Sequence, residues 1–241
     1  MKKVFLSLLT ISLFSFAAKA QNNSKIDLTG RASDHLMFQF GSDTWTNTPD
    51  SVKLGGGMSR HFNVYFMYDK PFKTNKHFSL AYGGGIGSSN IFFDNHTLVD
   101  IKSSAATLPF KRIDTTANHF SKVKATTIYL QAPIEIRYYS NPENPGKSWK
   151  LAAGIKAGLL LKSYTKSKNY VDRYGNSIYG KTYIEKESNK RFFNATDISL
   201  TGRAGYGLFS LDVAYQVNGV LRDGYGPVMN KFSVGLTVSG L

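Results

Sequence analysis

The stretch that decides the fold is TIYLQAPIEIRY, residues 127–138. From Ile128 onward every second residue is apolar, whereas the alternate positions include Gln131, Glu135 and Arg137. Successive side chains of a β-strand point to opposite faces of a sheet. The stretch therefore predicts a strand with one apolar face and one polar, charged face.

The same period of two recurs along the chain, and no window after residue 20 keeps the 3.6-residue period of a helix over three turns. The seven further alternating segments are 36–40, 62–68, 78–86, 151–161, 198–200, 209–215 and 232–238. With residues 127–138 they make eight predicted strands, an even number.

The connections between these strands alternate in length. Long polar connections span 43–57, 93–121, 164–195 and 218–228, and short ones span 70–76, 140–148 and 205–206. This alternation is typical of an outer-membrane barrel with its termini in the periplasm. We predict an all-β fold: an eight-stranded antiparallel up-and-down transmembrane β-barrel with periplasmic termini and long loops outside the cell. A soluble barrel would turn its apolar face inward, and the polar face here carries too few charges to cover an exterior.

The first twenty residues have the pattern of a secretory signal. Lysines at positions 2 and 3 precede the apolar run 4–16, and Ala18-Lys19-Ala20 is a small-x-small cleavage signature. We expect cleavage before Gln21 and localisation in the cell outer membrane. The predicted organisation is a signal peptide at 1–20, a short periplasmic segment at 21–32 and the barrel domain at 33–241.

Composition narrows the function classes. The chain is 41% hydrophobic with a mean hydropathy of −0.25, which excludes both a polytopic helical membrane protein and a disordered chain. It has no cysteine, which excludes disulfides, thiolate zinc sites and thiol nucleophiles.

The net charge of the mature chain indicates which partners it could bind. Removing the first twenty residues leaves 27 basic and 16 acidic residues, a net charge of +11. Nucleic acid is the usual partner of a basic chain, but export excludes it. Outer-membrane lipid and lipopolysaccharide phosphates are the predicted partners, and a solvated basic surface without a partner is the alternative.

Aromatic residues gather where the predicted strands end, as the interfacial girdles of outer-membrane barrels require. The predicted girdle residues are Trp45, Tyr138, Tyr139, Trp149 and Tyr206. Phe92, Phe93, Phe192 and Phe193 occupy similar positions next to the long loops.

The inward face is where charges should meet. An eight-stranded barrel has an interior that side chains fill, and unpaired charges in such a space are costly. The predicted interior network is Glu135, Arg137, Lys150, Lys156, Arg203 and Asp212. We expect Glu135 to lie within about 4 Å of Lys150, Lys156 or Arg203. A gated ion or proton path through the interior is the alternative.

Two details of the strands are also predicted. Pro133 cannot donate a ladder hydrogen bond, so we expect a local bulge there with the ring pointing inward. A two-residue turn at 205–206 would place Asp212 opposite Ser199.

Signals of catalysis and of metal or cofactor binding are weak. The five histidines include no pair at metal-ligand spacing, and the glycine run 83–87 lacks the Lys-Ser/Thr ending of a phosphate loop. His119 and Ser121 are the nearest approach to a hydrolase pair. We predict no catalytic, cofactor-binding or metal-binding residue.

Four runs of the sequence resemble the PorT-like outer-membrane β-barrel family: 63–69, 129–138, 200–207 and 232–238. The resemblance spans the mature chain, and Ala-Pro-Ile-Glu-Ile-Arg (132–137) is its most distinctive part. It implies a small outer-membrane barrel inserted by the barrel-assembly machinery. The founding member is associated with the type IX secretion system, so the resemblance also implies secretion-system components as partners.

Three functions remain open on the sequence. The first is a non-enzymatic outer-membrane barrel, structural or interaction-presenting through its long loops. The alternatives are an outer-membrane lipid-modifying enzyme and a soluble periplasmic ligand-binding barrel.

Overall fold

The computed structural model describes residues 36–55, 59–114 and 116–240. The predicted signal peptide (1–20) and periplasmic segment (21–32) lie outside the described residues. No helix in the described ranges is long and apolar enough to span a bilayer.

All eight predicted segments are strands. The longer strands are β1 (Leu36–Thr46), β2 (Arg60–Pro71), β3 (Phe78–Phe93), β6 (His119–Tyr139), β7 (Trp149–Val171), β9 (Thr196–Tyr206), β10 (Phe209–Gln216) and β11 (Asn230–Ser239). Shorter elements are β4 (Thr97–Val99), β5 (Phe110–Arg112), β8 (Ile184–Ser188) and a 3-10 turn, η2 (Pro145–Lys147).

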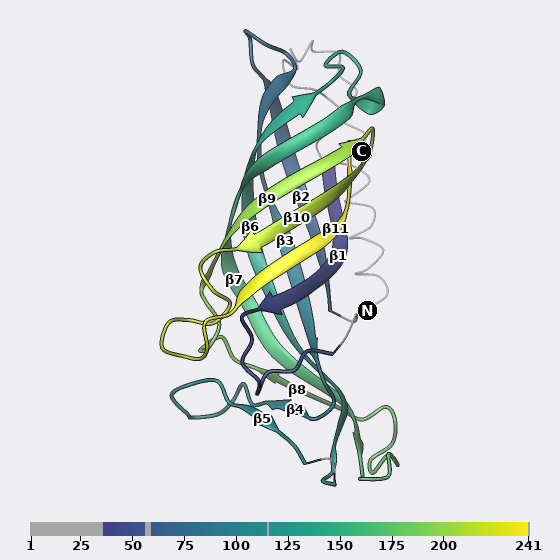
Figure 1. The fold of residues 1–241 in the computed structure, drawn as a ribbon, viewed down its shortest axis with the longest axis vertical. Coiled ribbons are helices and arrows are strands. Elements are labelled where there is room, and N and C mark those ends of the chain that lie inside the picture. Colours follow the sequence, from purple (N-terminus) through teal and green to yellow (C-terminus); the bar gives the residue numbers. More distant parts are fainter. Residues whose placement is uncertain (1–35, 56–58, 115, 241) are drawn as a thin grey trace, which may run out of the picture.

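The strands form one antiparallel sheet of nine, and β4 and β5 form a separate hairpin. The order in the large sheet is β6-β3-β2-β1-β11-β10-β9-β7-β8, and β6 also pairs with β7. Each of the eight longer strands therefore has two of the others as neighbours, and the sheet curves around an interior (Figure 1). β8 is an addition at the edge of β7.

The two faces of this sheet have the opposite polarity to those of a soluble protein. On β6, Leu130, Ile134 and Ile136 are about half exposed, whereas Glu135 and Arg137 on the inward face are buried. The same alternation continues around the sheet, because the side-chain period of a strand is two. The outward face is consequently an apolar surface.

The strands run further into the long connections than predicted. β1 continues to Thr46, β6 begins at His119 and β7 continues to Val171. β4, β5 and β8 also lie within connections expected to be irregular. The sequence pattern hides these extensions, because polar residues such as Lys122 and Lys124 replace the apolar residues on the outward face there, while the backbone groups still pair with neighbouring strands.

The predicted turn at 205–206 is wrong. β9 continues to Tyr206, and the turn is formed by Gly207 and Leu208. Gly207 has a φ of 59°, in the left-handed region that glycine enters without steric cost. The turn lies two residues later than expected, so Asp212 pairs with Arg203 and not with Ser199.

The predicted bulge at Pro133 is also wrong. Pro133 is buried and pairs in register with Lys156, and the register between β3 and β6 is the same on both sides of it. The irregularity on β6 lies at Ile128/Tyr129, where Leu161 of β7 is the extra residue. The extra residue reverses the alternation of β7, so Lys162 lies exposed although it has the sequence parity of buried Lys156.

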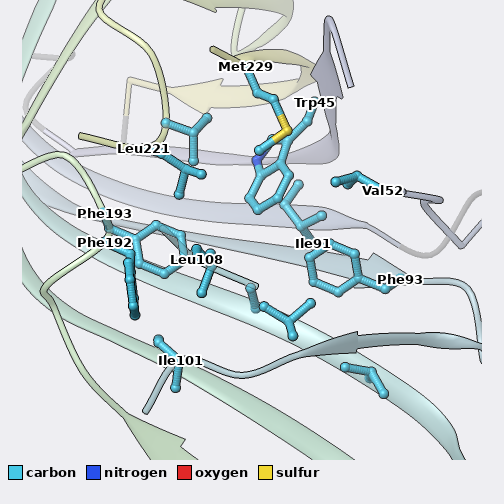
Figure 2. Packing of buried hydrophobic residues seen from close by; sticks show 14 residues of the cluster. Trp45, Val52, Ile91, Phe93, Ile101, Leu108, Phe192, Phe193, Leu221 and Met229 are labelled. Atoms are coloured by element: carbon cyan, nitrogen blue, oxygen red, sulfur yellow. The ribbon is translucent and has the colours of Figure 1, made fainter. Parts of the chain in front are cut away.

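The apolar core lies under the long connections at one end of the sheet. Figure 2 shows Trp45 of β1 and Val52 of the first long connection, with Phe93, Ile101, Phe192, Leu221 and Met229 from other segments. Every long connection supplies at least one buried side chain to this cluster. Trp45 and Phe93 meet edge to face, with ring centroids 5.6 Å apart. We call this cluster the loop core.

The loop core corrects part of the predicted girdle. Trp45, Phe93, Phe192 and Phe193 are at most 5% exposed, so they pack inside and do not face the surroundings. Tyr139 is also buried, because it follows outward-facing Tyr138 and so points inward.

Candidate functional site

Glu135 is the centre of the charged interior near the short turns. Its Oε2 accepts hydrogen bonds from Arg203 Nη2 at 2.6 Å and from Arg137 Nε at 3.0 Å. All three side chains are at most 9% exposed. One carboxylate therefore holds two guanidinium groups in a space with little solvent.

Small residues on β7 make this contact possible. Arg137 and Arg203 come from β6 and β9, which both pair with β7, and Ala152 is opposite each of them. Gly154 is opposite Glu135, and a Cβ at Gly154 would collide with the carbonyl oxygen of Ile134. The small size of Ala152 and Gly154 leaves the space through which Arg203 reaches across β7 to Glu135.

The other predicted members of the network have different contacts. Lys150 Nζ lies 5.4 Å from the centre of the Tyr139 ring. Lys156 Nζ donates to Tyr65 Oη at 3.4 Å. Asp212 accepts a hydrogen bond from Thr237 Oγ1 at 2.7 Å. The six predicted residues thus share the interior but form more than one cluster.

A second ion pair, which the sequence reasoning missed, lies closer to the loop core. Lys231 Nζ is 2.9 Å from Asp197 Oδ2, and Asp197 also accepts hydrogen bonds from Ser199 at 2.5 Å and from Gln131 at 3.3 Å. Lys231 precedes the predicted start of its strand at residue 232. Lys231 is two residues before Ser233 and so lies on the same inward face of the strand. This spacing was the signal in the sequence that could have identified it.

A buried histidine extends this second cluster. His61 Nδ1 is 2.7 Å from Asp43 Oδ1, and Asp43 accepts a further hydrogen bond from Ser89. His61 Nε2 lies 4.0 Å from Asp212 Oδ2, so the histidine stands between two carboxylates. Asp43 was missed because residues 43–57 were predicted to be a loop.

The space left between these clusters is small. A cavity of about 20 Å³ is lined by residues that include His61, Tyr65, Gln131, Lys156 and Arg203. This volume suits about one water molecule. It is far too small for a substrate.

The hydrolase pair suggested by the sequence is not assembled. The His119 ring nitrogen Nδ1 lies 3.1 Å from the carbonyl of Ala117, and Ser121 donates to the carbonyl of Lys168. The His119 and His96 rings are tilted against each other, with centroids 4.6 Å apart. Among the described residues, no group of three or more His, Asp or Glu side chains could hold a metal ion.

Three of the predicted girdle residues lie on the outward face at the short-turn end. Trp149 and Tyr206 are 65% and 50% exposed, and their rings meet edge to face at 5.5 Å. Tyr138 packs against Phe78 at 5.3 Å. This is the amphipathic aromatic surface that suits a boundary between lipid and water.

A known protein family matches most of the chain. The family model described as outer membrane protein beta-barrel domain matches residues 19–222, which include every longer strand except β11. No curated protein matches the chain.

Two solved structures resemble the chain at low identity. Both are of Ail, the attachment invasion locus protein of Yersinia pestis, one of them in complex with the heparin analogue sucrose octasulfate. The complex is 12% identical over 87% of this chain and 97% of Ail, with a TM-score of 0.37. The second is 11% identical over 86% and 97%, with a TM-score of 0.35.

Proposed function

Because the chain belongs to the outer membrane protein beta-barrel domain family, we propose that it is a non-enzymatic outer-membrane barrel that presents its long loops outside the cell. In this proposal the eight longer strands form a closed transmembrane barrel, and both termini lie in the periplasm. The pairing of β6 with β7 and the exposed apolar face support it.

The observation that carries the proposal is the filled interior. Buried ion pairs occupy it near the short turns and in its middle, and the loop core occupies its other end. A barrel filled in this way offers partners its apolar outer face and the loops and turns at its two ends. The proposed role is therefore structural or interaction-presenting.

Membrane fractionation with gel analysis tests the outer-membrane part. Folded outer-membrane protein should migrate differently on SDS gels before and after heating. Purified protein in planar bilayers should show no steady conductance. Recovery in the soluble periplasmic fraction, or a stable open channel, would contradict the proposal.

Surface proteolysis tests the orientation. In intact cells trypsin should cut first within 164–195, which is long, exposed and rich in lysine and arginine. Cleavage within 140–148 should require permeabilised cells, which provides the control. Cleavage within 140–148 in intact cells, before any cleavage within 164–195, would show that the orientation is the reverse of the one proposed.

A comparison of lipid A between a deletion strain and its parent tests the non-enzymatic part. An unchanged mass spectrum is expected, since His119 and Ser121 make their hydrogen bonds with backbone carbonyls and not with each other. A new or missing acyl or phosphate group would favour the lipid-modifying enzyme.

We further propose a link to type IX protein secretion, supported by the resemblance of runs such as 132–137 to the PorT-like family. Secretion-system components would then bind the loops or the periplasmic turns. Quantifying type IX cargo in the medium of a deletion strain tests this link. Unchanged cargo would remove secretion and leave the barrel proposal intact.

A further inference from the structure

The outward face of the sheet carries a compact group of lysines where β6, β7 and β8 extend beyond the apolar surface. The pairing register places Lys124 of β6 opposite Lys166 of β7, and Lys166 opposite Lys186 of β8. Two residues further along these strands, away from the apolar surface, Lys122 is opposite Lys168. We call these five residues the lysine face.

The lysine face lacks neutralising groups of its own. Each of the five lysines is farther than 4.0 Å from every acidic group in the described part of the chain. The nearest acids along β8, Glu185 and Glu187, alternate with Lys186 and point to the other face. Like charges directly opposite each other on neighbouring strands are destabilising. The arrangement is therefore complementary to an anion.

Two of the lysines are held in place by their neighbours. Lys124 Nζ donates to Asn90 Oδ1 at 2.7 Å and lies 5.5 Å from the centre of the Phe92 ring. Lys186 Nζ lies 4.2 Å from the centre of the Tyr164 ring. These contacts fix the ammonium groups before a ligand arrives, which lowers the entropy cost of binding.

The position of the lysine face indicates an amphiphilic ligand. On the same face of β6 the apolar residues run from Ile136 to Leu130, and Ile128 is the last of them before Lys124. Lys124 lies four positions along the strand from Ile128, about 13 Å at 3.3 Å per residue. A molecule with acyl chains against the apolar residues would bring its headgroup to the lysines.

We propose that the lysine face binds the phosphate groups of a phosphorylated lipid of the outer leaflet, the chemistry of the lipid A headgroup. The inference rests on the proposed function, because it requires the apolar face to lie in a membrane. It adds a specific headgroup site to that function. Charge complementarity and continuity with the apolar face both support a lipid in preference to a soluble polyanion.

The test compares lysine variants in the full chain, folded in neutral detergent. The triple variant Lys124→Gln, Lys166→Gln and Lys186→Gln removes the central row of the lysine face. The matched control Lys102→Gln, Lys111→Gln and Lys181→Gln removes three exposed lysines elsewhere in the long connections. Native mass spectrometry with added lipid A measures the bound fraction for each.

We expect the central-row variant to bind lipid A with an affinity lower than that of wild type by roughly tenfold or more. The control variant should bind lipid A as wild type does. Wild-type protein should lose affinity to a similar extent for dephosphorylated lipid A, and increasingly at higher salt. Equal binding by the central-row variant would overturn the proposal. So would equal competition by inorganic phosphate, or a preference for heparin over lipid A.

Heat modifiability on gels separates failure of this inference from failure of the proposed function. Variants that migrate as folded barrels but bind lipid A like wild type would refute the lysine face alone. Wild-type protein that shows no heat-modifiable form would refute the barrel on which the inference rests.

Discussion

The two ends of the interior are filled by different chemistry. Near the short turns, strands place charged side chains inside, and Glu135 joins two arginines there. Under the long connections, the interior ends in an apolar core like that of a soluble protein. Strands that expose their apolar face to lipid leave polar residues for the interior, whereas loops outside the membrane are free to turn apolar residues inward.

This difference has consequences for stability. The charged end depends on complete pairing, because removal of one partner leaves the other buried and uncompensated. The loop core depends on volume and contact area, as in ordinary cores. Substitutions at the two ends should therefore destabilise the protein in different ways.

The largest expected effect is at the charged end. Glu135→Ala should destabilise the folded barrel by about 3–5 kcal/mol, because Arg137 and Arg203 would lose the carboxylate they share. Urea unfolding in lipid vesicles measures the change. Glu187→Ala on β8 is the control and should cost less than about 0.5 kcal/mol. Equal stability of the two variants would show that Glu135 is not a buried partner.

A substitution in the loop core should act locally. Phe192→Ala removes a fully buried ring and should weaken the loop core by about 3 kcal/mol. The expected readout is faster proteolysis within 164–195, with a smaller change in the unfolding midpoint of the strands. Tyr179→Ala, an exposed ring in the same connection, is the control. If strand unfolding shifted as much as for Glu135→Ala, the two ends would form one cooperative unit.

The small residues beside Glu135 give a smaller effect. Gly154→Ala should cost about 1–3 kcal/mol, because the new methyl group would collide with the Ile134 carbonyl and crowd Glu135. Gly84→Ala is the matched control: its Cβ would lie 3.9 Å from the Gln131 carbonyl oxygen, an ordinary contact. Measuring both by the same urea unfolding separates crowding from the general effect of replacing a strand glycine.

The smallest effect is expected at a charge outside the barrel. Burial raises the pKa of Asp94, but the backbone amide of His96 and the Arg112 guanidinium outweigh it and hold the pKa below its ordinary value. The Arg112 pair, at 2.9 Å, is partly exposed and should contribute less than about 1 kcal/mol.

The sign of the pH dependence follows from the lowered pKa. The contribution of Asp94 is complete above its ordinary pKa of about 4 and is lost as the pH falls through the lower folded value. Deuterium uptake in the β4–β5 hairpin should therefore rise only below about pH 4. Asp94→Asn should remove this step, and a step that persists in the variant would assign it to another group.

The sequence predicted the strands well, because lipid requires an apolar outer face and the period of two records it directly. Parity was also sufficient to place Tyr139 and Trp45 inside, since each alternates with outward-facing neighbours. The girdle prediction used the position of these rings at strand ends and overlooked parity.

The pairings inside the barrel were harder to predict. Asp197 and Lys231 lie on β9 and β11, which are separated by β10, so their contact depends on the registers of two pairings. The error of two residues in the 205–206 turn shifted one of those registers. The reversed alternation after Leu161 likewise depends on a single extra residue that no periodicity reveals.

The loop core also divides each long connection into an anchored part and a free part. Phe192 and Phe193 hold the third connection down, while Tyr174 and Tyr179 in the same connection remain largely exposed. Substitutions in the free part therefore change the exposed surface of this connection while its buried anchors stay in place.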